Sequence, residues 1–344
     1  MAGSARPNSG AQDRHPVSDW IALSDSAEPV APGLLQRGLF VLEFALPLDA
    51  PTVLLQIQTD RPWPRTFSVF FDPAAGLVVV HRQGATLRRH LIPGPLPQHQ
   101  GAGRLTFAFD APQRTWRMGY ELIGETTKRS ARGTLPLPMT GADLNDLCSA
   151  AAGTQRHRAV LWFGATQGDT LPDRAPWIGL RTPVNTARGR VPAGLLRPGD
   201  RIATLDQGFL PLHGLIHRTL PSRGTFVPVL LRTPFFGLSG DILVSSDQLV
   251  LISGASVEYL YGVEEALISA ASLCDGQVAQ KDERRAVTHS VALDLGQPAL
   301  VTADGCCLMS ATGNHARLPR LALKDFEALP LLALLGRTAL RHVA

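Results

Sequence analysis

The chain has 344 residues, of which 44% are hydrophobic and 18% charged, so it is long enough for two domains with separate cores. Its formal net charge of +4 comes from scattered basic residues without a continuous stripe, which argues against a nucleic-acid partner. No stretch is long enough to span a membrane, and the polar N-terminus lacks the apolar segment of a Sec signal peptide. We therefore expect a soluble protein that is cytoplasmic or exported without such a signal.

The four cysteines are Cys148, Cys274, Cys306 and Cys307, and they show no C-x-x-C or histidine-paired spacing of the kind that zinc sites need. Adjacent cysteines such as Cys306 and Cys307 rarely close a relaxed disulfide. No P-loop, dinucleotide fingerprint or G-x-S-x-G motif occurs. We expect no disulfide framework, no metal and no cofactor.

The first half of the chain is predicted to be a β domain. Residues 1–18 are polar and rich in Gly, Ser and Pro, which predicts a disordered tail. Within residues 19–165, short β-prone runs bounded by Pro, Gly or Asp follow at regular spacing, which predicts an antiparallel sandwich similar to the concanavalin and laminin-G jelly rolls. The runs are Leu39–Leu46, Thr52–Gln58, Thr66–Phe71, Leu77–Arg82, Thr86–Ile92, Arg104–Asp110 and Thr115–Leu122, with a further strand at Ala159–Phe163.

Such sandwiches often bind sugars, and this one has residue types that could do so. Three aromatic rings could stack on a saccharide and three carboxylates could hold calcium: Trp63, Trp116 and Tyr120, and Asp60, Asp72 and Asp110. The alternative is that Trp116 and Tyr120 fill the core and that Asp72 and Asp110 form turns. We favour this second interpretation, and a glycan or protein partner stays open.

The second half is predicted to be another β domain. Residues 166–176 are rich in turn formers and predict a linker, and residues 319–344 predict a short C-terminal helical segment. Residues 177–318 lie between them and contain short β-prone runs. The predicted strands are Arg201–Leu205, Phe209–His213, Leu215–His217, Phe226–Leu231, Ile242–Val244, Leu249–Ile252, Ala286–Ala292 and Ala299–Thr302.

The start of this second domain carries an ordered set of turn motifs. Thr186 to Gly189 reads as a turn, and it is followed by the apolar stretch Val191–Leu196. A tight turn comes next, in which Pro presets φ, Gly accepts a positive φ and Asp bonds its own backbone; its residues are Leu196, Arg197, Pro198, Gly199 and Asp200. Asp206 and Gly208 then close the following hairpin.

These motifs, with Leu243–Leu251 and Val257–Gly262 after them, resemble the Hint fold that Hedgehog C-terminal domains share with inteins, in its bacterial branch. The resemblance covers roughly residues 175–315. It implies an all-β domain and an ancestral activity of self-cleavage or splicing. In that activity a thiol or hydroxyl attacks the preceding carbonyl, and a histidine protonates the scissile amide.

Both chemical groups are replaced in this chain. The position of the family's cysteine falls at Trp177, and no Cys, Ser or Thr lies between Ala175 and Arg181. Gln248 stands at the histidine position, and an amide cannot exchange a proton near neutral pH. We therefore expect a Hint domain without self-cleavage, acting as a structural or interaction module. The alternatives are residual self-cleavage by an unorthodox hydroxyl, for which Thr182, Thr186 and Ser245 are weak candidates, and sugar binding by the first domain.

Overall fold

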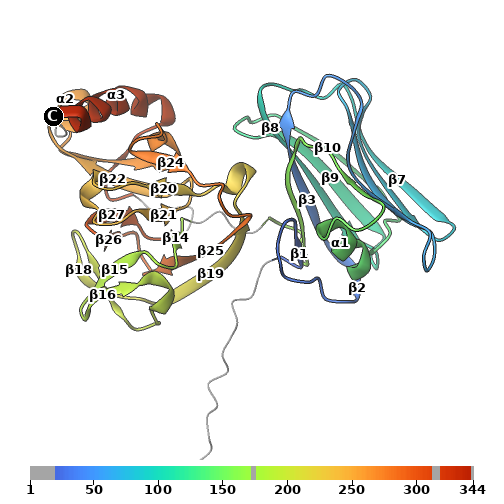
Figure 1. Cartoon of the computed structure of the whole chain (residues 1–344), viewed down its shortest axis with the longest axis horizontal. Coiled ribbons are helices and arrows are strands. Elements are labelled where there is room, and N and C mark those ends of the chain that lie inside the picture. The colour runs from blue at the N-terminus through green and yellow to red at the C-terminus, as the bar shows by residue number, and fades with distance from the viewer. Residues whose placement is uncertain (1–19, 172–175, 312–317, 342–344) are drawn as a thin grey trace, which may run out of the picture.

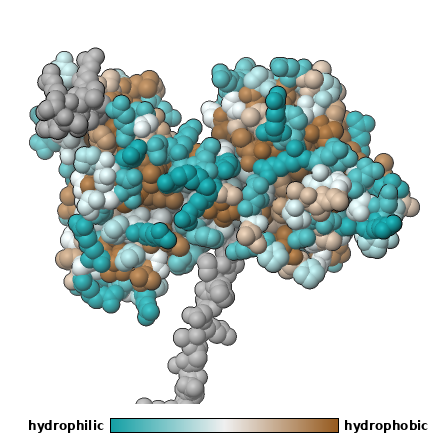
Figure 2. All heavy atoms as spheres, viewed as in Figure 1, coloured by the Kyte–Doolittle hydropathy of each residue, from teal (hydrophilic) through white to brown (hydrophobic). Residues whose placement is uncertain are grey.

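The computed structural model describes residues 20–171, 176–311 and 318–341, and these residues form two mainly β lobes (Figure 1). The predicted tail, residues 1–18, lies outside this range. Figure 2 shows that the lobes touch along one side of each, with hydrophilic and apolar side chains mixed over the visible face. Within the described residues no helix is long and apolar enough to cross a bilayer.

The first lobe is a sandwich of two antiparallel sheets. One sheet has the strand order β1-β13-β3-β8-β9-β10, and the facing sheet has the order β12-β4-β5-β6-β7. The first comprises β1 (Ala22–Leu23), β3 (Arg37–Leu46), β8 (Gly101–Asp110), β9 (Thr115–Leu122), β10 (Lys128–Thr134) and β13 (Val160–Thr166). The second comprises β4 (Thr52–Thr59), β5 (Arg65–Asp72), β6 (Gly76–Gln83), β7 (Thr86–Pro93) and β12 (Thr154–Arg156). The predicted sandwich is confirmed.

Alternation along β3 explains how this lobe is filled. Phe40 and Phe44 point between the sheets. The ring centroid of Phe40 lies 4.9 Å from that of Phe67 in the opposite sheet, and that of Phe44 lies 5.2 Å from that of Phe71. Leu39 and Val41 point to the outer face of the same sheet and are nevertheless buried. The outer face of β3 is therefore covered by another part of the molecule.

All seven predicted strands of the sandwich exist, and strand β10 and helix α1 are among the elements that escaped prediction. β10 has no apolar side chain except Ala131, so it carries no hydrophobic pattern, and it is held by its antiparallel pairing with β9. Helix α1 (Gly141–Cys148) follows the short pair β2 (Leu34–Leu35) and β11 (Met139–Thr140). Its N-cap, Thr140, accepts a hydrogen bond from the backbone N–H of Asp143.

The second lobe contains two further sheets of short strands. One has the order β19-β25-β14-β21-β20-β24, and the other the order β16-β15-β17-β26-β27-β22-β23-β28, with β18 paired to β17. The first comprises β14 (Ile178–Gly179), β19 (Gly214–Pro221), β20 (Val229–Leu231), β21 (Ile242–Val244), β24 (Ala279–Lys281) and β25 (Val287–Asp294). The second comprises β15 (Pro183–Thr186), β16 (Gly189–Pro192), β17 (Arg201–Thr204), β18 (Gly208–Pro211), β22 (Leu249–Ser253), β23 (Glu265–Ser269), β26 (Leu300–Ala303), β27 (Cys306–Met309) and β28 (Leu321–Ala322).

Helices close one end of this lobe. α2 (Ala255–Tyr261) packs on α3 (Asp325–Arg341), which confirms the predicted C-terminal helical segment (Figure 1). The predicted strand Phe226–Leu231 is wrong in its first half. Gly224–Phe226 forms a 3-10 turn, η2, and only Val229–Leu231 is a strand. Phe226 instead leaves the sheet and contacts the sandwich.

The two lobes share a buried apolar cluster. Trp162 of β13 makes edge-to-face contacts with Trp20 and with Phe226 of η2, each at 5.3 Å between ring centroids. Trp177 belongs to the same cluster. Rings from both lobes therefore bury one another, and this contact covers part of the outer face of the sandwich sheet.

A buried ion pair lies beside this cluster. Glu43 of β3 is 0% exposed, and its carboxylate accepts hydrogen bonds from Arg104 of β8 at 2.6 and 2.9 Å. The backbone N–H and the hydroxyl of Thr225 in η2 donate to the same carboxylate at 2.9 and 2.6 Å. Gly224 has φ +58°, and a Cβ there would come within 2.1 Å of the Glu43 carboxylate, so only glycine permits this approach. The second lobe thus completes the coordination of a charge that the first lobe buries.

Candidate functional site

The register of the second lobe brings the backbone of Trp177 against Ser245. The N–H of Ser245 donates to the carbonyl of Trp177 at 3.0 Å, and the N–H of Trp177 donates to the hydroxyl of Ser245 at 3.3 Å. Trp177 precedes β14, and Ser245 follows β21, with which β14 pairs. The hydroxyl of Ser245 therefore contacts the amide between Pro176 and Trp177, which is the bond that the family register expects a Hint domain to cut.

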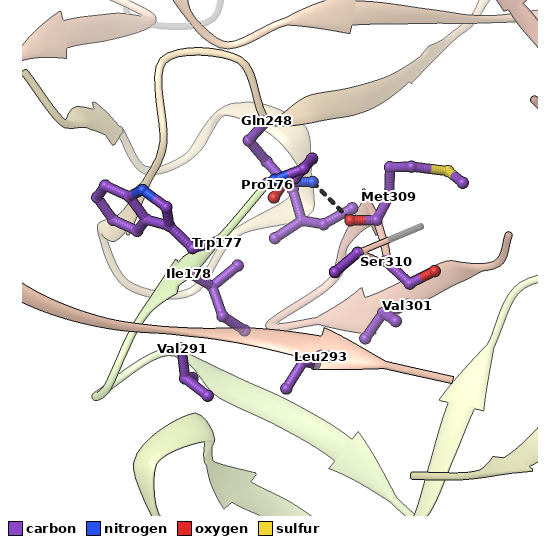
Figure 3. A pocket seen from close by; sticks show the side chains of 11 residues that line it. Pro176, Trp177, Ile178, Gln248, Val291, Leu293, Val301, Met309 and Ser310 are labelled. Atoms are coloured by element: carbon purple, nitrogen blue, oxygen red, sulfur yellow. Dashed lines mark hydrogen bonds between the residues drawn. The ribbon is translucent and has the colours of Figure 1, made fainter. Parts of the chain in front are cut away.

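Trp177 and Gln248 line the same small cavity, of about 10 Å³ (Figure 3). The other lining residues are almost all apolar: Pro176, Ile178, Val291, Leu293, Val301, Leu308, Met309, Ser310 and Ala311. None of the described residues that line it is ionisable at neutral pH. A space of this size holds at most one water molecule.

The side chain of Gln248 is buried, and its amide nitrogen makes two hydrogen bonds. Its amide nitrogen donates to the carbonyl of Met309 at 2.8 Å and to that of Leu249 at 3.2 Å. In Figure 3 the amide reaches toward Met309, whereas the indole of Trp177 points away from it. The indole joins the interlobe cluster instead. The two replaced positions therefore share a cavity without their side chains meeting.

The three candidate hydroxyls are placed differently. The hydroxyl of Thr186 braces the predicted turn, since it donates to the carbonyl of Gly189 at 2.8 Å and accepts from the N–H of Arg188 at 3.1 Å. The hydroxyl of Thr182 is buried and has no hydrogen-bond partner among the described residues. Of the three, only Ser245 is hydrogen-bonded to position 177. It does not line the cavity of Gln248 but a neighbouring pocket, and the described residues that line this pocket include no imidazole. Ser310 carried no signal in the sequence, yet it lines the cavity of Gln248, and its hydroxyl accepts from the N–H of Ala299 at 3.1 Å.

The turn motifs that suggested the fold do what their residue types predict. Gly199 has φ +93°, and Asp200 accepts a hydrogen bond from the N–H of Arg197 at 2.9 Å. Gly189 and Gly208 also have positive φ, and Leu196 enters the core. Asp206 pairs with Arg320 at 2.9 Å, which ties this hairpin to the segment before α3. These residues build the domain and do not meet at the cavity.

The sugar-binding candidates of the sandwich do not converge as a set, although two of them, Trp116 and Asp110, line one hollow. Tyr120 lies in the core and its hydroxyl donates to the carbonyl of Pro97, while Asp72 and Asp110 accept from nearby backbone N–H groups in turns. Trp116 packs on His90 at 4.7 Å, and Trp63 lies under Arg65 elsewhere on the lobe. Within the described residues no three His, Cys, Asp or Glu side chains gather as a metal site would need.

A larger hollow lies on the sandwich and was not predicted. It has a volume of about 910 Å³ and is lined by β3, β8, β9 and β10 and by residues 167–169, which follow β13. Arg37, Arg117 and Arg132 contribute to its lining together with Asp110 and Asp169. These residues are far apart in the sequence, and one of the strands escaped prediction, so no sequence pattern joined them.

Comparison with known proteins gives one family match and several weak structural ones. Residues 180–313 match the family model of the Hint domain. No curated protein matches the chain. The CBM40 domain of the Ruminococcus gnavus IT-sialidase is 14% identical, with 40% of this chain and 80% of that chain covered and a TM-score of 0.27.

A second structure of the same CBM40, bound to alpha2,6 sialyllactose, is 10% identical, with 45% and 96% covered and a TM-score of 0.30. The LG1-3 region of the laminin alpha2 chain is 9% identical, with 87% of this chain and 57% of that chain covered and a TM-score of 0.27. Overlaps this weak carry no argument about function. The family match, together with the turn motifs and the all-β second lobe, makes this chain a Hint domain-containing protein, with the Hint domain at residues 180–313.

Proposed function

We propose that the Hint domain of this chain neither cleaves nor splices and that it acts as a structural module bound to its own sandwich. The observation that carries the proposal is the cavity shared by Trp177 and Gln248. It is about 10 Å³ in volume, and none of the described residues that line it is ionisable at neutral pH. Hint chemistry needs an attacking thiol or hydroxyl and a proton donor at this junction, and the positions that would hold them carry an indole and an amide.

The indole at position 177 supports a structural role. It belongs to the cluster of Trp20, Trp162 and Phe226, which joins the two lobes. Replacing a nucleophile by a large ring at this position removes the reaction and adds apolar contact with the neighbouring domain. We place the sandwich at residues 19–165 and the Hint domain at residues 177–318, with the linker between them.

The polar contact of η2 supports the same role. The two hydrogen bonds from Thr225 to Glu43 cross from the Hint domain to the sandwich, and Arg104 donates to both partners. A carboxylate that is fully buried needs such partners, because an unpaired buried charge is strongly destabilising. The module therefore holds the sandwich in a defined position. Of the residues that suggested sugar binding from the sequence, only Trp116 and Asp110 line a common hollow, so no second function rests on that set.

Incubation of the purified chain tests the proposal. The chain is kept at neutral pH with hydroxylamine or with dithiothreitol, either of which releases an ester or thioester, and is then weighed by mass spectrometry. We expect an intact 36.9 kDa chain in every sample.

Fragments that end between residues 175 and 186 would contradict the proposal and support residual self-cleavage. In that case Thr182→Val, Thr186→Val and Ser245→Ala identify the attacking hydroxyl, because only the responsible substitution abolishes cleavage.

A further inference from the structure

The hollow on the sandwich lies on the outer face of the sheet that the Hint domain partly covers. Its floor consists of β3, β8, β9 and β10, and residues 167–169 form one wall. Its volume of about 910 Å³ lies in the range of small-molecule sites, about 300–1,000 Å³. The feature is therefore large enough for a short oligosaccharide.

Two arginines face each other across this floor. Arg117 of β9 lies directly opposite Arg132 of β10 in the antiparallel register, and both side chains are exposed. Like charges in this position repel each other and destabilise the sheet. Within residues 20–171, 176–311 and 318–341, the side chain of neither arginine forms a hydrogen bond or an ion pair, and the same holds for the side chain of Arg37 at the edge of the hollow.

At the other end of the same sheet face, the basic side chains form ion pairs. There Arg104 pairs with Glu43 and Glu121, and Lys128 of β10 pairs with Glu121 at 2.7 Å. One pair of strands thus pairs its basic residues near the Hint domain and leaves the guanidinium groups of Arg117 and Arg132 without an ion pair in the hollow, although Asp110 and Asp169 also line it. An anion bound between Arg117 and Arg132 would supply the missing partner.

The remaining lining indicates what kind of anion fits. Exposed Thr115, Thr134, Gln113 and Gln167 offer hydroxyl and amide groups that both donate and accept hydrogen bonds. Apolar side chains contribute little, because Phe109 is buried and Trp116 packs on His90 inside the sandwich. A peptide would need apolar pockets for its side chains, whereas a polyhydroxylated ligand needs many polar partners.

We propose that this hollow binds a saccharide that carries a carboxylate, with the acid group held between Arg117 and Arg132. A planar guanidinium binds a carboxylate through two parallel hydrogen bonds, which gives direction as well as attraction. The sugar hydroxyls then contact the polar rim. The proposal concerns the sandwich and does not depend on whether the Hint domain cleaves.

The test is isothermal titration of the full chain at low salt. The probes are tetragalacturonate and a hyaluronan tetrasaccharide, with neutral cellotetraose and tetraglutamate as comparison ligands. We expect an acidic saccharide to bind at least about tenfold more tightly than cellotetraose and tetraglutamate. Its affinity should fall as the salt concentration rises. Arg117→Gln and Arg132→Gln should each weaken binding about tenfold, because each removes a charge-assisted pair of hydrogen bonds.

Arg89→Gln serves as the matched control, since Arg89 is an exposed arginine on β7 of the other sheet. We expect it to bind as the unchanged chain does. The thermal midpoints of Arg117→Gln and Arg132→Gln should not fall, because these substitutions relieve a repulsion. Failure of both acidic saccharides to bind overturns the proposal. Equal binding of tetraglutamate or cellotetraose overturns it too, as does equal loss of binding in Arg89→Gln.

Discussion

The junction cavity of the Hint domain and the hollow of the sandwich differ in every property that chemistry or binding requires. The cavity is about 10 Å³ in volume, and the side chains around it are apolar or have their hydrogen bonds satisfied within the protein. The hollow is about 910 Å³, open, and lined by guanidinium, carboxylate, amide and hydroxyl groups. The Hint domain thus has the smaller and less polar of the two spaces, and the sandwich has the larger one with charged and polar side chains in its lining.

On the proposed function, the fold of the Hint domain has outlasted its reaction. The turns at Gly189 and Gly199 keep the geometry that brings position 177 to position 248, while both side chains have changed. Backbone geometry depends on glycines, caps and cores, whereas the reaction depends on two side chains. Function therefore has to be argued from the site.

The largest expected change in stability comes from the contact between the two domains. Glu43→Ala removes the carboxylate that Arg104 and Thr225 share and leaves Arg104 buried without its main partner. We expect the free energy of unfolding to fall by about 3–5 kcal/mol, the usual loss when one partner of a buried ion pair is removed. Urea denaturation followed by tryptophan fluorescence measures it, because Trp162 and Trp177 lie in the adjacent cluster.

The matched control is Asp25→Asn, which removes the charge of the partly exposed pair Arg156–Asp25 and keeps a residue type that tolerates the positive φ of this position. A surface pair contributes only about 0–1 kcal/mol. A loss for Glu43→Ala no greater than for Asp25→Asn would mean that the interlobe carboxylate does not hold the domains together.

The sequence predicted the parts of the fold that depend on local pattern. Strands such as Leu39–Leu46 and Thr52–Gln58 alternate or are continuously apolar, and each appears within a few residues of its predicted bounds. β10 was missed, because Lys128–Thr134 is held by its neighbour and not by its own hydrophobic residues. Phe226 was assigned to a strand because its apolar side chain fits one, yet the ring contacts the other domain.

The candidate sites divide in the same way. The family register predicted that Trp177 and Gln248 would lie near one cavity, and both line it. The direction of the indole depends on Trp162 and Phe226, which come from elsewhere in the chain, so no local pattern could supply it. The hollow depends on a pairing between β9 and the unpredicted β10. Its arginines are therefore brought together by tertiary structure alone.

Acid should lower the free energy of unfolding of the sandwich more than that of the Hint domain, because the sandwich buries two histidines. His81 and His90 are each 1% exposed, and burial lowers the pKa of both imidazoles from 6.5 to about 4, with a further contribution from His90 for His81 and from Arg88 for His90. Below pH 6.5 each of these imidazoles is protonated in the unfolded chain, whereas in the folded chain it stays neutral until the pH falls to about 4. The stability is thus complete above pH 6.5 and is lost as the pH falls to 4, by about 3 kcal/mol for one such group.

Denaturation at pH 7, 5.5 and 4.5 measures this loss. His81→Leu should make the pH dependence shallower, whereas His99→Gln, at a histidine whose side chain is 69% exposed, should leave it unchanged. An identical slope in the unchanged chain and in His81→Leu would show that the buried imidazole does not titrate as its surroundings require.

The smallest expected loss of stability concerns Gln248. It tests whether this side chain is kept for its hydrogen bonds within the fold. Gln248→Leu keeps the side-chain volume but removes the donors to the carbonyls of Met309 and Leu249. Since buried carbonyls then lose a partner, we expect a loss of about 1–3 kcal/mol in the free energy of unfolding. Gln297→Leu, at an exposed glutamine bonded to Gln207, is the control and should change stability by less than about 0.5 kcal/mol. If Gln248→Leu is as stable as this control, the amide is not needed for packing, and its place in the cavity would need a chemical explanation after all.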